Sequence, residues 1–136
     1  MTRTLPVGAF FDTNIPLYLL SADAGKASRA EDLLAERGTI SVQVLNEFAA
    51  VARRKHATPW PDVVLMLDTL KHVCRVEPLT LDVHERAIDL ARRFGMPIYD
   101  AMIAASALTA GCAVLYSEDF QHGLRIEGMT VRNPFA

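Results

Sequence analysis

Cysteine and histidine are scarce in this 136-residue sequence, which holds two cysteines and four histidines. Cys74 and Cys112 each lie in an apolar context and form no C-x-x-C pair, so we expect both to be buried free thiols. The histidines show no metal-ligand spacing either. These patterns argue against a zinc site.

The sequence also lacks a long hydrophobic run and a strong charge of either sign. The most apolar helical stretch, 101–110, is far shorter than the ~20 residues that cross a membrane, and residues 1–8 hold no apolar core of signal-peptide length. We therefore expect a cytoplasmic protein with no membrane partner. The net charge of −2 gives no overall basic field, so nucleic acid could be bound only by local positive patches.

What the sequence does contain indicates a folded domain. Hydrophobic residues make up 51% of the chain and charged residues 22%, which excludes disorder. A chain of this length can bury a core without disulfides or metals. We therefore expect one domain over residues 1–136.

Short apolar or β-branched runs alternate with stretches of helical periodicity along the chain. The expected strands are 7–11, 39–42, 74–77, 112–116 and an edge strand at 129–132, with a polar loop over 120–128. The expected helices are 15–20, 26–37, 43–56, 59–72, 81–94 and 97–110. This alternation predicts an α/β fold with a mostly parallel sheet, whose strand ends meet at one edge.

Polar residues follow the first strand abruptly. The apolar residues Phe10 and Phe11 are followed by Asp12, Thr13 and Asn14, before a second apolar run begins at Ile15. In open α/β sheets, ligands gather outside the carboxyl ends of the strands, which is where Asp12 would lie. The alternative is that one of the three polar residues caps the following helix.

Other acids are expected to reach the same edge of the sheet. Glu47 shares a helix face with Val44 and Val51, so its carboxylate either turns toward the core or extends past it to solvent. Asp100 opens the most apolar helix, where a capping role is the alternative. Asp119 follows the strand at 112–116, after Ser117 and Glu118.

Four converging carboxylates repel one another unless a cation compensates. Mg²⁺ and Mn²⁺ prefer oxygen ligands and are commonly bound together with substrate phosphates, which makes phosphodiester hydrolysis the predicted chemistry. A phosphatase of the haloacid dehalogenase type would need a second aspartate two residues after Asp12. Position 14 is asparagine, so we set this alternative aside.

Four segments, in order, resemble the PIN-domain family, and in particular its VapC-type toxin ribonucleases. They are Phe10-Phe11-Asp12-Thr13-Asn14, Leu45-Asn46-Glu47-Phe48, Tyr99-Asp100-Ala101-Met102-Ile103-Ala104-Ala105-Ser106-Ala107 and Leu115-Tyr116-Ser117-Glu118-Asp119-Phe120. Four motifs in the right order are far more specific than one. The resemblance implies a three-layer α/β/α sandwich with the first strand at its centre.

The same resemblance implies roles for particular residues and partners. Asp12, Glu47, Asp100 and Asp119 would be the catalytic, metal-binding acids, supported by Thr13, Asn14 and Ser117. The fourth motif varies in this family, and we favour Asp119 over Glu118. The implied activity is an Mg²⁺- or Mn²⁺-dependent endoribonuclease, the toxin of a toxin–antitoxin pair, with RNA as substrate, a cognate antitoxin and a homodimeric state.

The family also contains RNA-processing nucleases without an antitoxin and non-catalytic RNA-binding scaffolds, which remain alternatives. The small size of the chain favours the toxin. The run Arg53-Arg54-Lys55 either stabilises its helix end or holds RNA. The apolar residues of helices 15–20 and 59–72 exceed what one buried side needs, so they either form an interface or complete the core.

Overall fold

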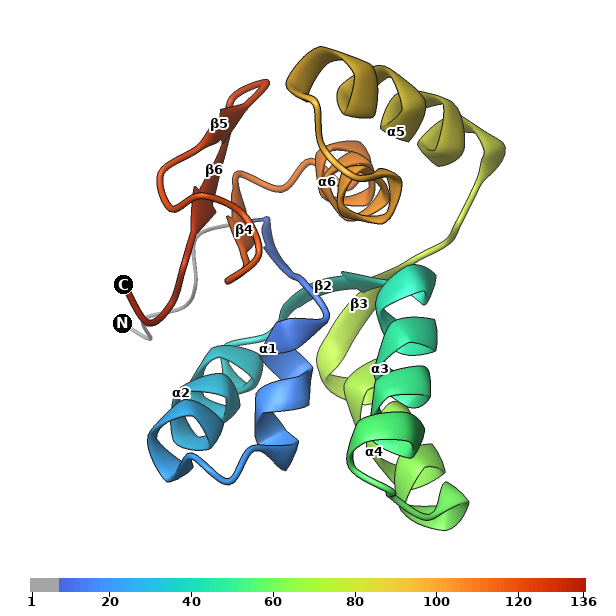
Figure 1. The fold of residues 1–136 in the computed structure, drawn as a ribbon, viewed down its shortest axis with the longest axis vertical. Helices are drawn as coiled ribbons and strands as arrows, with labels where there is room; N and C mark the ends of the chain where they lie inside the picture. Colours follow the sequence, from blue (N-terminus) through green and yellow to red (C-terminus); the bar gives the residue numbers. More distant parts are fainter. Residues whose placement is uncertain (1–7) are drawn as a thin grey trace.

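The structure, a computed structural model, describes residues 8–136 (Figure 1). The strands are β1 (Ala9–Phe11), β2 (Gly38–Ser41), β3 (Cys74–Glu77), β4 (Val114–Tyr116), β5 (Arg125–Ile126) and β6 (Met129–Arg132). The helices are α1 (Asn14–Leu17), the 3-10 helix η1 (Tyr18–Leu20), α2 (Ala24–Ala35), α3 (Val42–Lys55), α4 (Trp60–Val73), α5 (Leu81–Phe94) and α6 (Ile98–Thr109). Val7, expected to start the first strand, lies outside the described residues.

The strands form one sheet in the order β3-β2-β1-β4-β6-β5, parallel throughout except at β5. β2 pairs with one side of β1, and β3 pairs with the far side of β2. The next strand in the sequence, β4, pairs with the other side of β1. The strand order therefore reverses between β1 and β4. Such a reversal opens a crevice at the carboxyl ends of the two strands, where α/β proteins bind ligands.

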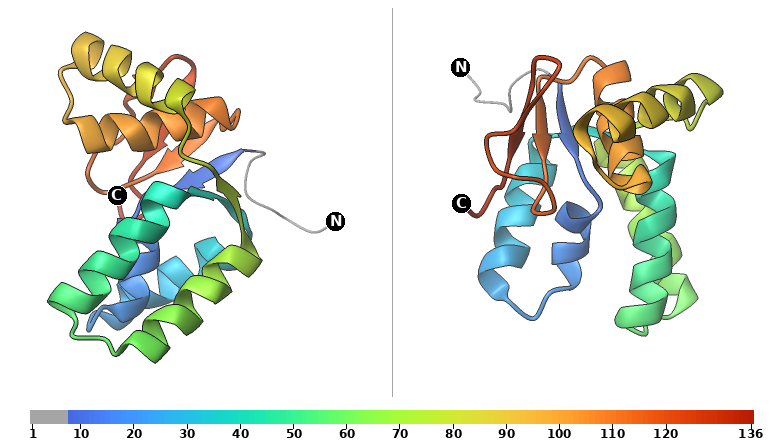
Figure 2. Two further views of the ribbon diagram at one scale, coloured as in Figure 1. Left: turned by 90° about the vertical axis from the view of Figure 1, so that its right-hand side faces the viewer. Right: turned by 45° about the horizontal axis from the view of Figure 1, so that its top comes forward.

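The same reversal decides which helices cover which face. Parallel crossovers are right-handed, so crossovers that run in opposite directions put their helices on opposite faces. Figures 1 and 2 show α1 to α4 on one side of the sheet and α5 with α6 on the other. The predicted three-layer α/β/α arrangement around the first strand is confirmed.

β1 lies in the centre of the core, and its three residues are at most 3% exposed. The Phe11 ring lies 6.0 Å from the Tyr116 ring of β4, measured between centroids, in a stacked arrangement. On the other side, Phe11 packs over Gly38 of β2, where an added Cβ would stand 2.6 Å from the ring atom Cε2. Glycine at this position therefore leaves room for the aromatic ring that anchors β1.

Local signals set the helix boundaries next to the sheet edge. The Ser41 hydroxyl accepts a hydrogen bond of 3.3 Å from the Val44 backbone N–H and so caps α3 directly after β2. The helix therefore starts at Val42, one residue earlier than expected, which fixes the position of Glu47 one turn further on. α5 ends at Gly95, whose φ of +64° suits glycine.

The expectation for the C-terminal region was wrong in two respects. Arg125–Ile126 lies within the expected loop 120–128 but forms β5, a short strand antiparallel to β6. The expected edge strand, β6, is an interior strand between β4 and β5, with Met129 and Val131 buried. The two strands are joined by Glu127 and Gly128, both with positive φ, as in a tight hairpin turn.

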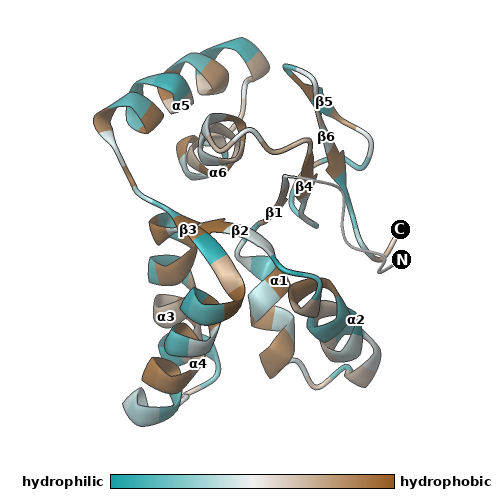
Figure 3. Ribbon diagram, turned by 180° about the vertical axis from the view of Figure 1, so that it is seen from behind, coloured by the Kyte–Doolittle hydropathy of each residue, from teal (hydrophilic) through white to brown (hydrophobic). Residues whose placement is uncertain are grey.

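Helical spacing predicts that Val64 and Phe94 face the core, but both are exposed. Val64 on α4 is 50% exposed, and Phe94 at the end of α5 is 38% exposed. Trp60 and Leu65 are also exposed, so α4 presents an apolar outer surface, whereas α5 alternates between hydrophobic and hydrophilic residues in Figure 3.

Cys74 and Cys112 are buried free thiols as predicted. Among residues 8–136, no helix has the length and apolar character needed to cross a membrane.

Candidate active site

Asp12 directly follows β1, at the carboxyl ends of β1 and β4, where the strand order reverses and a ligand crevice is expected. Its backbone N–H donates a hydrogen bond of 3.0 Å to the Tyr116 carbonyl, so the pairing of the two strands extends to this residue. The residue is only 4% exposed. The N-cap of α1 is Thr13, and no side chain hydrogen-bonds there as a cap. Helix capping therefore does not explain the polar residues after β1.

Two neighbouring residues hold the Asp12 carboxylate. Its Oδ1 accepts a hydrogen bond of 2.7 Å from the Thr13 backbone N–H, and its Oδ2 accepts one of 2.7 Å from the Ser117 hydroxyl. Ser117 follows β4 and also accepts a hydrogen bond of 3.0 Å from the Asp119 backbone N–H. A short network therefore joins the ends of β1 and β4.

The environment of Asp12 disfavours its negative charge. Burial raises the pKa of this carboxyl from 3.8 to about 7, against the hydrogen bonds from Ser117 and Thr13, which lower it. The negative charges of Asp119 and Glu47 raise the pKa further. A cation in the crevice would offset both the burial and the repulsion.

Glu47 and Asp100 approach the crevice from two different helices. Glu47 on α3 is half-buried, and its Oε1 accepts a hydrogen bond of 3.1 Å from the Thr13 hydroxyl. Asp100 lies in the first turn of α6, whose N-cap is Pro97. Burial raises the pKa of Asp100, and the charge of Asp119 raises it further. Asp119 therefore lies close enough to influence both Asp12 and Asp100.

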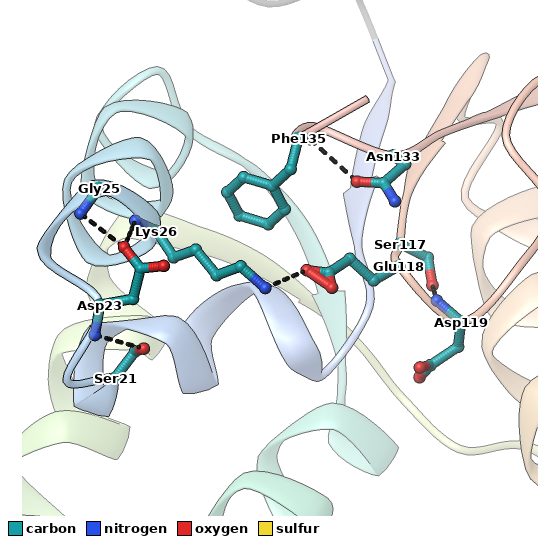
Figure 4. Close-up of polar contacts among 9 residues, drawn as sticks. All are labelled: Ser21, Asp23, Gly25, Lys26, Ser117, Glu118, Asp119, Asn133 and Phe135. Atoms are coloured by element: carbon teal, nitrogen blue, oxygen red, sulfur yellow. Dashed lines mark hydrogen bonds and ion pairs between the residues drawn. The ribbon is translucent and has the colours of Figure 1, made fainter.

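Glu118 and Asp119 face different neighbours, although they are adjacent in sequence. Glu118 forms an ion pair with Lys26 of α2, with 3.2 Å between Oε1 and Nζ. Figure 4 shows these two side chains pointing toward one another, whereas the Asp119 carboxylate lies apart from them. Of the two acids, Asp119 is the one whose carboxylate is not engaged by Lys26.

Sequence reasoning missed the surroundings of Lys26. Its ammonium lies 5.1 Å from the centre of the Tyr18 ring and 5.3 Å from that of Phe135, and these two rings pack edge to face. Burial and a hydrogen bond with Glu118 raise the pKa of Tyr18. Residues 18, 26, 118 and 135 share no sequence motif, so only the fold brings them together.

The donors in the crevice suit a hard cation. Within residues 8–136, no three acidic, histidine or cysteine side chains stand close enough together to enclose a metal ion. Magnesium sites, however, commonly use one or two carboxylates and complete the coordination with water and substrate phosphate. Next to the acids, both amide atoms of Asn14 are buried without a hydrogen-bond partner. Such an amide could bind ordered water beside an ion.

Comparison with known proteins agrees with this arrangement. The PIN domain sequence model matches residues 9–123, which include all four acids. A search of curated protein sequences found no significant match. The toxin VapC20 of Mycobacterium tuberculosis, which cleaves the sarcin-ricin loop, superposes with a TM-score of 0.67 at 25% identity, covering 80% of this chain and 88% of that one.

Two assemblies share the fold at lower identity. A toxin–antitoxin complex from Klebsiella pneumoniae has a TM-score of 0.71 at 23% identity, covering 93% of this chain and 97% of its own. DNA-bound VapBC from Salmonella typhimurium has a TM-score of 0.69 at 19% identity, covering 95% and 99%. The resemblance found in the four sequence motifs is confirmed, and the chain belongs to the PIN domain family.

Proposed function

We propose that this protein is a metal-dependent endoribonuclease that hydrolyses RNA phosphodiester bonds. The observation that carries the proposal is the buried Asp12 carboxyl, whose pKa is raised to about 7 at the point where the strand order reverses. Keeping a buried acid beside other acids is unfavourable without a cation. Perturbed acids in a crevice are typical of functional sites.

In this proposal Asp12, Glu47, Asp100 and Asp119 bind Mg²⁺ or Mn²⁺, one or two of them directly and the others through metal-bound water. A bound divalent ion lowers the pKa of its water and neutralises the charge that develops on the phosphodiester. Thr13 and Ser117 keep the carboxylates of Glu47 and Asp12 oriented through their hydroxyl groups. Glu118 pairs with Lys26, and we therefore assign the fourth acid to Asp119.

A non-catalytic RNA-binding scaffold is the alternative within the family. The complete set of four acids favours the nuclease. Purified protein incubated with labelled RNA and Mn²⁺, with EDTA in a parallel reaction, separates the two. We expect cleavage that EDTA abolishes, whereas RNA binding without cleavage would identify a scaffold.

We further propose that the nuclease is the toxin of a toxin–antitoxin pair. Solved relatives of the same fold include a toxin–antitoxin complex and VapBC. An apolar groove of about 440 Å³ lies between α2, η1 and α4, lined by Leu19, Leu34, Leu65 and Leu70 among others. An apolar segment of an antitoxin bound in this groove would cover surface that is otherwise in contact with water.

Growth assays separate the toxin from an RNA-processing nuclease. Expression of this chain alone should arrest growth, and co-expression of the neighbouring open reading frame should restore it. Harmless expression of a protein that still cleaves RNA in vitro would contradict the toxin assignment and leave the nuclease assignment in place.

We also propose a homodimer. Trp60 and Val64, which lie outside the apolar groove, give α4 an exposed apolar surface that a second copy could cover. Light scattering of the purified protein should give about twice the chain mass of 15.0 kDa. A mass equal to one chain at micromolar concentration would refute the dimer.

A further inference from the structure

A second hollow lies on the side of α3 that faces α1 and η1. Its volume is about 310 Å³, near the lower end of the ~300–1,000 Å³ typical of small-ligand pockets. Its lining residues are Asn14, Leu17, Tyr18, Ser21, Ala22, Val51, Lys55 and His56. The hollow thus begins at Asn14, two residues after Asp12, and ends at the last turn of α3.

One face of α3 connects the hollow to the acids. Glu47, Val51 and Lys55 are spaced four residues apart, so they lie on the same face of the helix. Lys55 is about 12 Å along the helix from Glu47, since each residue adds ~1.5 Å. A chain that passes the acids can therefore continue over Val51 and place a further phosphate at Lys55.

The basic residues at the end of α3 differ in their contacts, and only some of them line the hollow. Arg53 donates a hydrogen bond of 3.0 Å to the Thr58 carbonyl, and its guanidinium lies 4.9 Å from the centre of the Trp60 ring. These contacts direct Arg53 to the α3–α4 turn. Lys55 and His56 line the hollow, whereas Arg54 is exposed and does not. The three-residue run therefore offers one cation, Lys55, to a ligand in the hollow.

The residues that line the hollow include apolar side chains, which suit a base, and one lysine, which suits a phosphate. Leu17, Ala22 and Val51 provide apolar surface for the flat face of a base, and Lys55 provides a positive charge for a phosphate. Asn14 also lines the hollow, and both of its side-chain amide atoms are buried without a hydrogen-bond partner. An inorganic anion alone would make no use of the apolar surface.

We propose that this hollow is a nucleotide subsite, which binds an unpaired nucleotide of the RNA next to the phosphodiester at the acids. The inference rests on the proposed nuclease function and adds the place where the substrate is selected. An unpaired base is required because a base within a duplex keeps its faces stacked and its edge paired.

Binding of short single-stranded RNA in EDTA tests the subsite without cleavage. Each basic contact with a single strand contributes about 0.7 to the slope of log K against log salt. Lys55→Ala should lower the slope by about this amount and weaken binding at low salt. Arg54→Ala is the matched control, because it removes the same charge from the same helix end but lies outside the hollow. Its slope should stay closer to wild type.

A second pair of variants tests the apolar part. Ala22 is exposed at the rim, so Ala22→Phe should narrow the hollow without disturbing the core. We expect at least about fivefold weaker binding and a smaller difference in affinity between oligonucleotides of uridine, cytidine and adenosine. Ala24→Phe, an exposed position outside the hollow, should bind like wild type.

The outcomes distinguish the subsite from the nuclease itself. If wild-type protein cleaves RNA with Mg²⁺ but Lys55→Ala and Arg54→Ala change the slope equally, the subsite is refuted and the nuclease stands. The same conclusion follows if Ala22→Phe binds like Ala24→Phe. A wild-type protein that neither binds nor cleaves RNA refutes both. If Lys55→Ala leaves RNA binding unchanged but abolishes rescue by the neighbouring reading frame, the hollow binds a peptide, and the proposal is wrong.

Discussion

Replacing Asp12 by asparagine should stabilise the metal-free protein, although it removes a residue central to the proposed activity. The folded-state pKa of Asp12 is about 7, above its ordinary value of 3.8. Between these two values the folded protein binds more protons than the unfolded chain, so its free energy of unfolding falls as the pH rises. Above pH 7 the full cost of the buried charge is present.

The size of the effect follows from the pKa. A rise from 3.8 to about 7 corresponds to roughly 4 kcal/mol, at about 1.36 kcal/mol per unit. The Asp12 carboxylate accepts one hydrogen bond at each oxygen, whereas asparagine has a single oxygen, so the loss of one acceptor offsets about 1–2 kcal/mol. We therefore expect Asp12→Asn to be about 2–3 kcal/mol more stable than wild type at pH 8.

Chemical denaturation in EDTA at pH 8 and pH 4.5 measures this difference. At pH 4.5 the cost of the buried charge falls to about 1 kcal/mol, so the advantage of the variant should nearly disappear. Asp32→Asn, on the exposed surface of α2, is the control and should change little at either pH. Equal stability of Asp12→Asn and wild type at pH 8, or a gain in stability that does not change with pH, would show that the buried Asp12 charge does not destabilise the fold.

Two further predictions concern the fourth acid and the packing of β1. Asp119→Asn should reduce cleavage by more than about 100-fold, because the loss of a metal ligand costs several kcal/mol of transition-state stabilisation. Glu118→Gln should cost less than about tenfold, since it removes a partly exposed ion pair, and a larger loss than in Asp119→Asn would reverse our assignment. Gly38→Ala should lower the free energy of unfolding by about 1–3 kcal/mol, because its Cβ would stand 2.6 Å from Phe11 Cε2. Unchanged denaturation would show that the ring moves freely.

The positions of the sheet and its acids were accessible from sequence, because each depends on local signals. Phe10 and Phe11 form a buried run that stops at Asp12, and a buried run followed by polar residues indicates the end of a parallel strand. The parallel direction of the strands then brings their carboxyl ends to one edge of the sheet. The central position of β1 came from the family resemblance and not from the pattern, and the full strand order was not predicted.

The features that sequence reasoning missed depend on contacts between distant segments. β5 has only two residues, too few to show an alternating pattern, and it exists because Glu127 and Gly128 turn the chain back along β6. The exposure of Val64 could not be read from helical spacing, because α4 is apolar around most of its circumference. The ion pair between Lys26 and Glu118 joins residues 92 positions apart.

The decisive test of the proposed metal site is the cleavage of one labelled RNA, measured against Mg²⁺ concentration for wild type, Asp12→Asn, Glu47→Gln and Asp100→Asn. We expect the wild-type rate to rise to saturation with Mg²⁺ and to be lost in EDTA. We also expect each variant to be at least about 100-fold slower while denaturing cooperatively as a folded protein. A wild-type rate that EDTA leaves unchanged, or variants that cleave at the wild-type rate, would contradict the claim that these acids form a metal-dependent nuclease site.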